Sequence, residues 1–87
     1  MKQTVYVIIR SVTTGGEKRK DVVAAAANEY AAKKRMSELV KWYEGMKDGD
    51  GVAIWSCARL LWDVAKFTSR SSNKSFRLDA VEREVEI

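Results

Sequence analysis

Hydrophobic and polar residues alternate with two different periods along this chain, and the most regular stretch is an amphipathic helix. Between Asn28 and Trp42 the apolar positions recur every three or four residues, as one face of a helix requires. Basic and polar side chains fill the opposite side, and Asn28 stands where a side-chain oxygen caps the first turn. The pattern therefore predicts a helix with the buried stripe Ala32, Met36, Leu39, Val40 and Tyr43.

The N-terminal segment has the pattern of a β-hairpin. In TVYVIIRSV both alternating sets of positions are largely apolar, which is typical of a strand inside a sheet. Residues 13–16 predict a turn, because paired glycines accept the positive φ angles that tight hairpins need. We expect a second strand over 18–26. The alternative is one long helix over 22–43, but it would place Glu29 on the same face as Met36.

The glycine-rich stretch 45–51 predicts a loop. Its alternating acids and glycines suggest a calcium site, but Ala53 stands where that motif needs glycine and Arg59 where it needs a bidentate glutamate. We therefore expect Asp50 to cap a second helix over 52–67. The most apolar face of this second helix is Ala53, Cys57, Leu60, Leu61 and Val64.

The C-terminal segment SFRLDAVEREVEI predicts a last strand that changes phase near Ala80 and ends on Ile87. A competing interpretation makes 62–68 a strand in a hairpin with this segment, through the turn SRSSNK. We take the helix as the first choice. The predicted fold is α+β, with a small antiparallel sheet of about three strands packed against two helices, in the order β-β-α-α-β, as a single domain over 1–87.

Length and composition limit the class of protein. With 87 residues, 46% of them hydrophobic, the chain has material for one small core, and such a small domain gains stability from a second copy, so we expect a homodimer. There is no apolar run long enough for a bilayer and no signal-peptide pattern, which predicts a soluble cytoplasmic protein without membrane contact. Cys57 has no disulfide partner, and we assign it a packing role.

The residue types argue against an enzyme. The chain has no histidine and one cysteine, so it offers no cysteine–histidine pair, no serine triad and no usual zinc site. Gly15 and Gly16 are followed by Glu17 rather than by a phosphate-binding helix. We predict a non-enzymatic protein that uses no cofactor and no metal.

The first candidate surface lies on the predicted second helix. There Trp55, Arg59, Trp62 and Lys66 would form one strip, and tryptophan and arginine are the residue types most enriched at binding hot spots. The alternative is that both indoles close the edge of the core or a dimer seam.

The second candidate surface is basic. The net charge is +4, and the segment 66–77 holds four bases and no acid, whereas 79–86 has four acids against one arginine. Such a segment can attract phosphates, with an ordinary solvated loop as the alternative. The candidate nucleic-acid contacts are Lys66, Arg70, Lys74 and Arg77, extended by Lys18, Arg19 and Lys20.

The order of these elements resembles small uncharacterised proteins of bacteriophages and mobile elements. The likeness rests on the opening TVYVIIRS, the strand running into ANEYAAKKRMSEL, and the final LDAVEREVEI, and it leaves out 49–75. It implies an accessory protein that binds and inhibits a host protein, such as a component of antiviral defence, in the host cytoplasm. Our first hypothesis is therefore a host-protein binder, and our second is a nucleic-acid-binding module that uses the basic segment 66–77.

Overall fold

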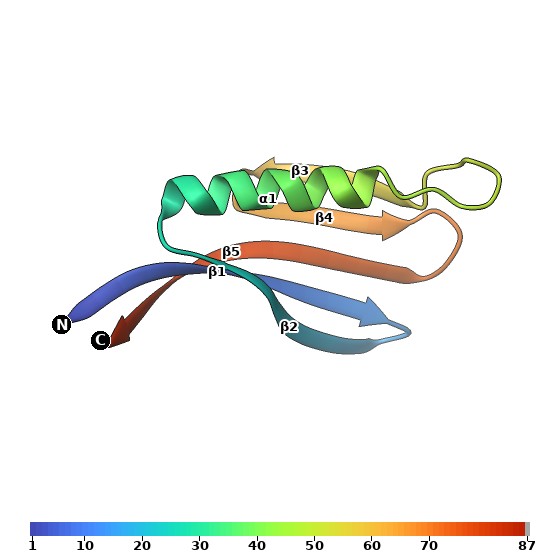
Figure 1. Cartoon of the computed structure of the whole chain (residues 1–87). Helices are drawn as coiled ribbons and strands as arrows, with labels where there is room; N and C mark the ends of the chain where they lie inside the picture. The colour runs from blue at the N-terminus through green and yellow to red at the C-terminus, as the bar shows by residue number, and fades with distance from the viewer. Residues whose placement is uncertain (87) are drawn as a thin grey trace.

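The computed structural model describes residues 1–86, which form a five-stranded antiparallel sheet with one helix on one of its sides (Figure 1). The strands lie side by side in the order β2-β1-β5-β4-β3, and the two ends of the chain meet at one end of the sheet. The predicted last strand includes Ile87, which lies outside the described residues. The elements are β1 (Lys2–Thr14), β2 (Glu17–Ala26), α1 (Glu29–Glu44), β3 (Trp55–Leu61), β4 (Val64–Ser69) and β5 (Lys74–Glu86).

The N-terminal hairpin predicted from the sequence is confirmed. Gly15 and Gly16 connect β1 to β2 with φ angles of 57° and 91°, as a two-residue turn of this hand requires. Strand β1 is an inner strand, since it pairs with β2 on one side and with β5 on the other. The register between β1 and β2 shifts at Ile8 and Ile9, which makes Val23 an extra residue on β2 and turns it toward the core.

The predicted amphipathic helix is α1. Its first turn is capped as expected, because the Asn28 side-chain oxygen accepts a hydrogen bond from the Ala31 amide at 2.8 Å. Four of the five predicted stripe residues are buried, and Leu39 is half-buried against the same core. Within residues 1–86 no helix is both long and apolar enough to cross a bilayer.

The predicted second helix over 52–67 is wrong, and with it the fold of three strands and two helices. This segment instead forms the hairpin β3–β4, and the competing strand interpretation of 62–68 matches β4, which pairs with β5. The physical reason is the alternation of buried Ala65 and Phe67 with exposed Lys66 and Thr68.

The loop before β3 is ordered by an aspartate other than the predicted cap. Asp48, not Asp50, accepts backbone hydrogen bonds, from the amides of Asp50 at 2.8 Å and Val52 at 3.0 Å. Among residues 1–86 no group of three acidic or cysteine side chains is placed to hold a metal ion.

The core lies entirely between α1 and the sheet face that it covers. Phe67 and Phe76 stack with ring centroids 4.5 Å apart, and Tyr43 from α1 packs on both rings. Arg10 of β1 donates a hydrogen bond to the Tyr43 hydroxyl and a pair of hydrogen bonds to Asp21 of β2. This contact joins α1 to two strands. The buried set is Ile8, Ala32, Met36, Val40, Tyr43, Ala65, Phe67, Phe76 and Leu78.

In the predicted second helix Leu60 would lie on the buried face, whereas in the hairpin β3–β4 it is exposed. Replacing Leu78, which is 0% exposed, with alanine is expected to lower the free energy of unfolding by about 2–5 kcal/mol, because it opens a cavity. Leu60 is 61% exposed, so Leu60→Ala is expected to change the free energy of unfolding by less than about 0.5 kcal/mol. Urea denaturation measures both, and a large loss for Leu60→Ala would support the helix instead.

Candidate functional site

The face of the sheet opposite α1, here called the open face, has no element of residues 1–86 packed on it (Figure 1). Because strand side chains alternate, the residues that point away from α1 are fixed by register. On β1 these include Ile9, Ser11 and Thr13, which follow one another at every second position. Their partners on β5 are Asp79, Arg77 and Ser75, respectively.

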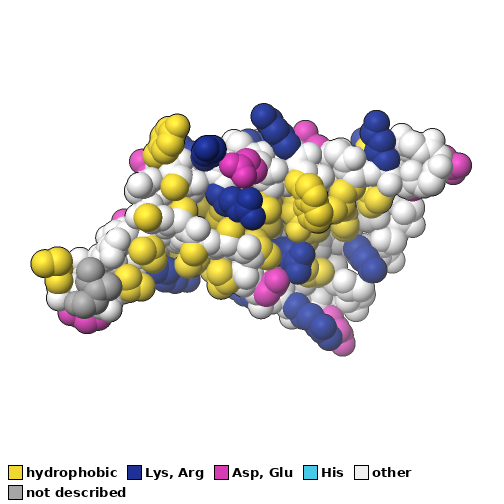
Figure 2. All heavy atoms as spheres, viewed as in Figure 1, with side chains coloured by type: hydrophobic (Ala, Val, Ile, Leu, Met, Phe, Trp, Pro, Cys, Tyr) yellow, Lys and Arg dark blue, Asp and Glu magenta, His cyan; other side chains and the backbone are white. Residues whose placement is uncertain are grey.

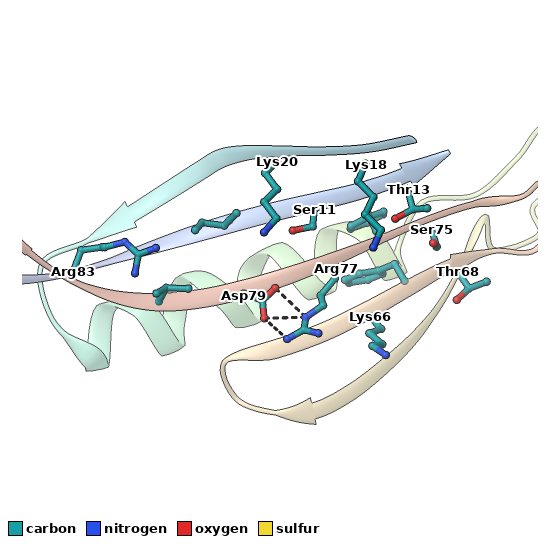
Figure 3. A pocket seen from close by; sticks show the side chains of 14 residues that line it. Ser11, Thr13, Lys18, Lys20, Lys66, Thr68, Ser75, Arg77, Asp79 and Arg83 are labelled. Atoms are coloured by element: carbon teal, nitrogen blue, oxygen red, sulfur yellow. Dashed lines mark hydrogen bonds and ion pairs between the residues drawn. The ribbon is translucent and has the colours of Figure 1, made fainter. Parts of the chain in front are cut away.

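Four strands together form an open concavity of about 800 Å³ on this face, which we call the basic groove. Figure 3 shows its side chains on the near side of the sheet, with α1 behind, and places Lys18 and Lys20 on β2 and Lys66 on β4. Arg77 and Arg83 come from β5 between these two walls. The polar residues of the groove are Ser11, Thr13, Lys18, Lys20, Lys66, Thr68, Ser75, Arg77, Asp79 and Arg83.

The groove residues lie in rows that run across the strands. One row holds Lys20, Ser11, Arg77 and Lys66, each beside the next in the register. The neighbouring row, which is nearer the β1–β2 turn, consists of Lys18 and three hydroxyl side chains, Thr13, Ser75 and Thr68. Cations and hydroxyl donors thus cover the half of the open face nearest the β1–β2 turn.

The electrostatics of the groove are strongly one-sided. It holds five bases and one acid, Asp79, so of the chain's 16 bases and 12 acids eleven of each lie elsewhere and cancel. Asp79 is already paired, because it accepts hydrogen bonds from Arg77 at 2.8–3.0 Å, and this contact raises the pKa of the guanidinium. The protein's net charge of +4 is therefore the charge of this one face.

The cationic row contains an unfavourable contact. Lys66 on β4 lies directly opposite Arg77 on β5, and like charges in opposed positions of a sheet repel. Both side chains are exposed, and Figure 3 shows them on neighbouring strands, with the Arg77 guanidinium turned toward Asp79. The ion pair of Arg77 with Asp79 offsets part of this repulsion, and an anion bound beside Lys66 would offset the rest.

The predicted basic residues divide between this groove and other places. Lys18, Lys20, Lys66 and Arg77 come together there, although they are far apart in the sequence. Arg19 does not join them, because it alternates with Lys18 and Lys20 and faces the α1 side beside Val12. Arg70 lies in the β4–β5 turn and Lys74 is the first residue of β5, and both are outside the groove. The sequence did not point to Arg83, because it stands in an acidic segment. The available signal was that Arg83 and Arg77 are an even number of residues apart on one strand and therefore face the same side of the sheet.

The predicted tryptophan strip is not formed, since its spacing assumed a helix. The Trp55 ring packs edge-on against Phe76 at 4.7 Å, in the core. Trp62 lies at the β3–β4 turn between Tyr6 and the Lys33 ammonium, at 6.1 and 5.4 Å. Arg59 donates to the Trp62 carbonyl on the α1 side, whereas Lys66 points to the open face. These four residues therefore do not share one surface.

Two further features lie on the α1 side of the molecule. Cys57 is half-buried beside the core, and burial, followed by the nearby Glu44, raises the pKa of its thiol. A raised pKa disfavours the reactive thiolate, in keeping with a packing role. Trp42 on α1 is 61% exposed next to Leu39, and Figure 2 shows hydrophobic side chains gathered over the middle of this side of the molecule.

Comparison of the chain with protein-family models, curated proteins and solved structures gives no match. The resemblance to phage and mobile-element proteins therefore stays a prediction.

The contact between Lys66 and Arg77 predicts a salt-dependent stability. Lys66→Gln is expected to raise Tm by about 1–3 °C at low salt, because it removes a like-charge pair, and the gain should vanish in about 1 M NaCl. Thermal unfolding followed by circular dichroism measures this. Lys47→Gln, which changes an exposed lysine of the loop after α1, is the matched control with no expected gain. A gain that persists in 1 M NaCl would show that repulsion is not its cause.

Proposed function

We propose that this protein binds nucleic acid through the basic groove. The observation that carries the proposal is the gathering of the whole net charge on one uncovered face, from bases on β2, β4 and β5. Charge arranged in this way attracts a polyanion to one side of the protein and orients it there.

The chemistry of the groove suits phosphate groups. Lysine and arginine side chains neutralise phosphates, and serine and threonine hydroxyls donate hydrogen bonds to phosphate oxygens. Ser11 and Thr13 stand between the bases of β2 and those of β5, so a phosphate chain crossing the strands would find cations and hydroxyl donors in turn. The repulsion between Lys66 and Arg77 further favours a bound anion.

Charge reversal inside the groove tests the proposal directly. For the double variant Lys20→Glu and Lys66→Glu we expect at least about tenfold weaker binding of fluorescent 20-residue nucleic acid, single- or double-stranded, at 100 mM salt. The wild-type protein should lose affinity with salt with a log–log slope near about −4, and the variant should lose about two units of that slope.

The control reverses the same amount of charge elsewhere. Lys34→Glu with Lys47→Glu changes two exposed lysines outside the groove, and binding is expected to stay within about threefold of wild type. Fluorescence anisotropy measures all three proteins, with circular dichroism to check folding. Equal losses in both double variants would mean that total charge, not the groove, holds the nucleic acid, and the proposal would fail.

Binding of a protein partner is a second candidate function, and one observation favours it. The indole of Trp42 is 61% exposed on α1, beside Leu39, Arg35 and Glu38. Exposed tryptophan next to arginine is the composition of a binding hot spot, and this surface lies on the side away from the groove.

The Trp42 surface is tested by a matched pair of variants. Trp42→Ala is expected to abolish capture of a defined partner from bacterial lysate treated with nuclease, whereas Tyr30→Ala, another exposed aromatic of the same helix, leaves it intact. Pull-down with mass spectrometry is the measurement. If both variants capture the same proteins as wild type, this surface does not bind them.

A further inference from the structure

The absence of stacking groups narrows the class of nucleic acid. All eight aromatic residues of the chain are described, and each lies on α1 or on the α1 side of the sheet. Phe67 and Phe76 border the groove, but their rings pack against Tyr43 on the side of α1. Proteins that hold single strands rely on aromatic side chains on which unpaired bases stack. The groove offers none.

The side chains of the groove also offer little for reading bases. Asparagine and glutamine, the usual partners of adenine edges, are missing from it, and the one carboxylate, Asp79, is occupied by Arg77. What remains are lysines, arginines and hydroxyl groups. Arginine can also read guanine, but Arg77 is held by Asp79, and Arg83 donates a hydrogen bond to the Glu82 carbonyl, so we assign the groove side chains to phosphate oxygens.

The width of the groove matches two phosphate strands. Lys20 and Lys66 stand in one row with β1 and β5 between them, and three strand spacings of about 4.8 Å separate them by about 14 Å. A duplex that lies along β5 makes most of a full turn over the length of the groove, so the phosphates of both strands come to face the sheet. The two lysine walls can therefore contact phosphates of both strands.

The length of the groove sets the size of the site. Along β5 it extends from Ser75 to Arg83, which at about 3.4 Å per residue is about 27 Å. Successive base pairs of a duplex also rise by about 3.4 Å, so this length corresponds to about eight base pairs. The concave shape fits a convex cylinder lying along β5.

We propose, on the basis of the function proposed above, that the occupant of the groove is a double-stranded nucleic acid, held by the phosphates of both strands across about eight base pairs, without base reading. Lys18 and Lys20 hold one strand and Lys66 the other. Arg77 and Arg83 lie on the floor between them.

The experiment compares labelled ligands by fluorescence anisotropy at 100 mM salt. We expect a 12-base-pair duplex to bind at least about tenfold more tightly than its 12-nucleotide strands, and duplexes rich in A·T or in G·C to agree within about threefold. Affinity should rise steeply from 4 to 8 base pairs and little beyond. Parallel DNA and RNA duplexes identify which sugar the groove accepts, and tight binding of either supports the proposal.

The outcomes separate this inference from the function on which it rests. Single strands bound as tightly as duplexes would overturn the inference and leave nucleic-acid binding standing, whereas no binding of either would overturn both. A heparin fragment of equal charge that competes as well as the duplex would also overturn it. Trp42→Ala is expected to leave duplex binding unchanged, and a loss would overturn the inference by placing bases on the α1 side.

Discussion

A single helix can cover only one face of a five-stranded sheet, and the packing of Tyr43 decides which face that is. Its ring lies 5.3 Å from Phe67 and 4.6 Å from Phe76, measured between centroids, and its hydroxyl accepts a hydrogen bond from Arg10. This contact fixes α1 over the central strands, so the apolar half of each strand turns toward it. The other half is left to solvent, where polar side chains cost least.

The uncovered face then acquires a character of its own. A solvated sheet face needs only to be polar, and mixed charges in ion pairs would satisfy that need. Here the open face holds the ion pair Arg77–Asp79 and four further bases, while the ion pairs Lys2–Glu84 and Arg10–Asp21 lie on the α1 side. An excess of bases on one face, against balanced charge elsewhere, is more easily explained by a ligand than by stability alone.

Local patterns predicted the first half of the fold well. The paired glycines predicted a tight turn, the alternation of β1 predicted a strand, and the capped stripe predicted the helix α1. All three are found in the structure. The hairpin β3–β4 was missed because Cys57, Leu60 and Leu61 happen to have helical spacing, and only the short alternation around Phe67 argued otherwise. Tertiary pairing with β5 settled what the local signal could not.

The sequence predicted only some of the groove residues, because neighbouring residues of a strand point to opposite faces of the sheet. Counting charge by segment grouped Lys18, Arg19 and Lys20, but a period of two sends Arg19 to the opposite face. The same count made the end of β5 acidic. In the sheet its glutamates face the α1 side, whereas Arg83 faces the groove, so one segment contributes acid to one surface and base to the other. Charge in a β protein therefore has to be counted by face, and the face is known only once the register is known.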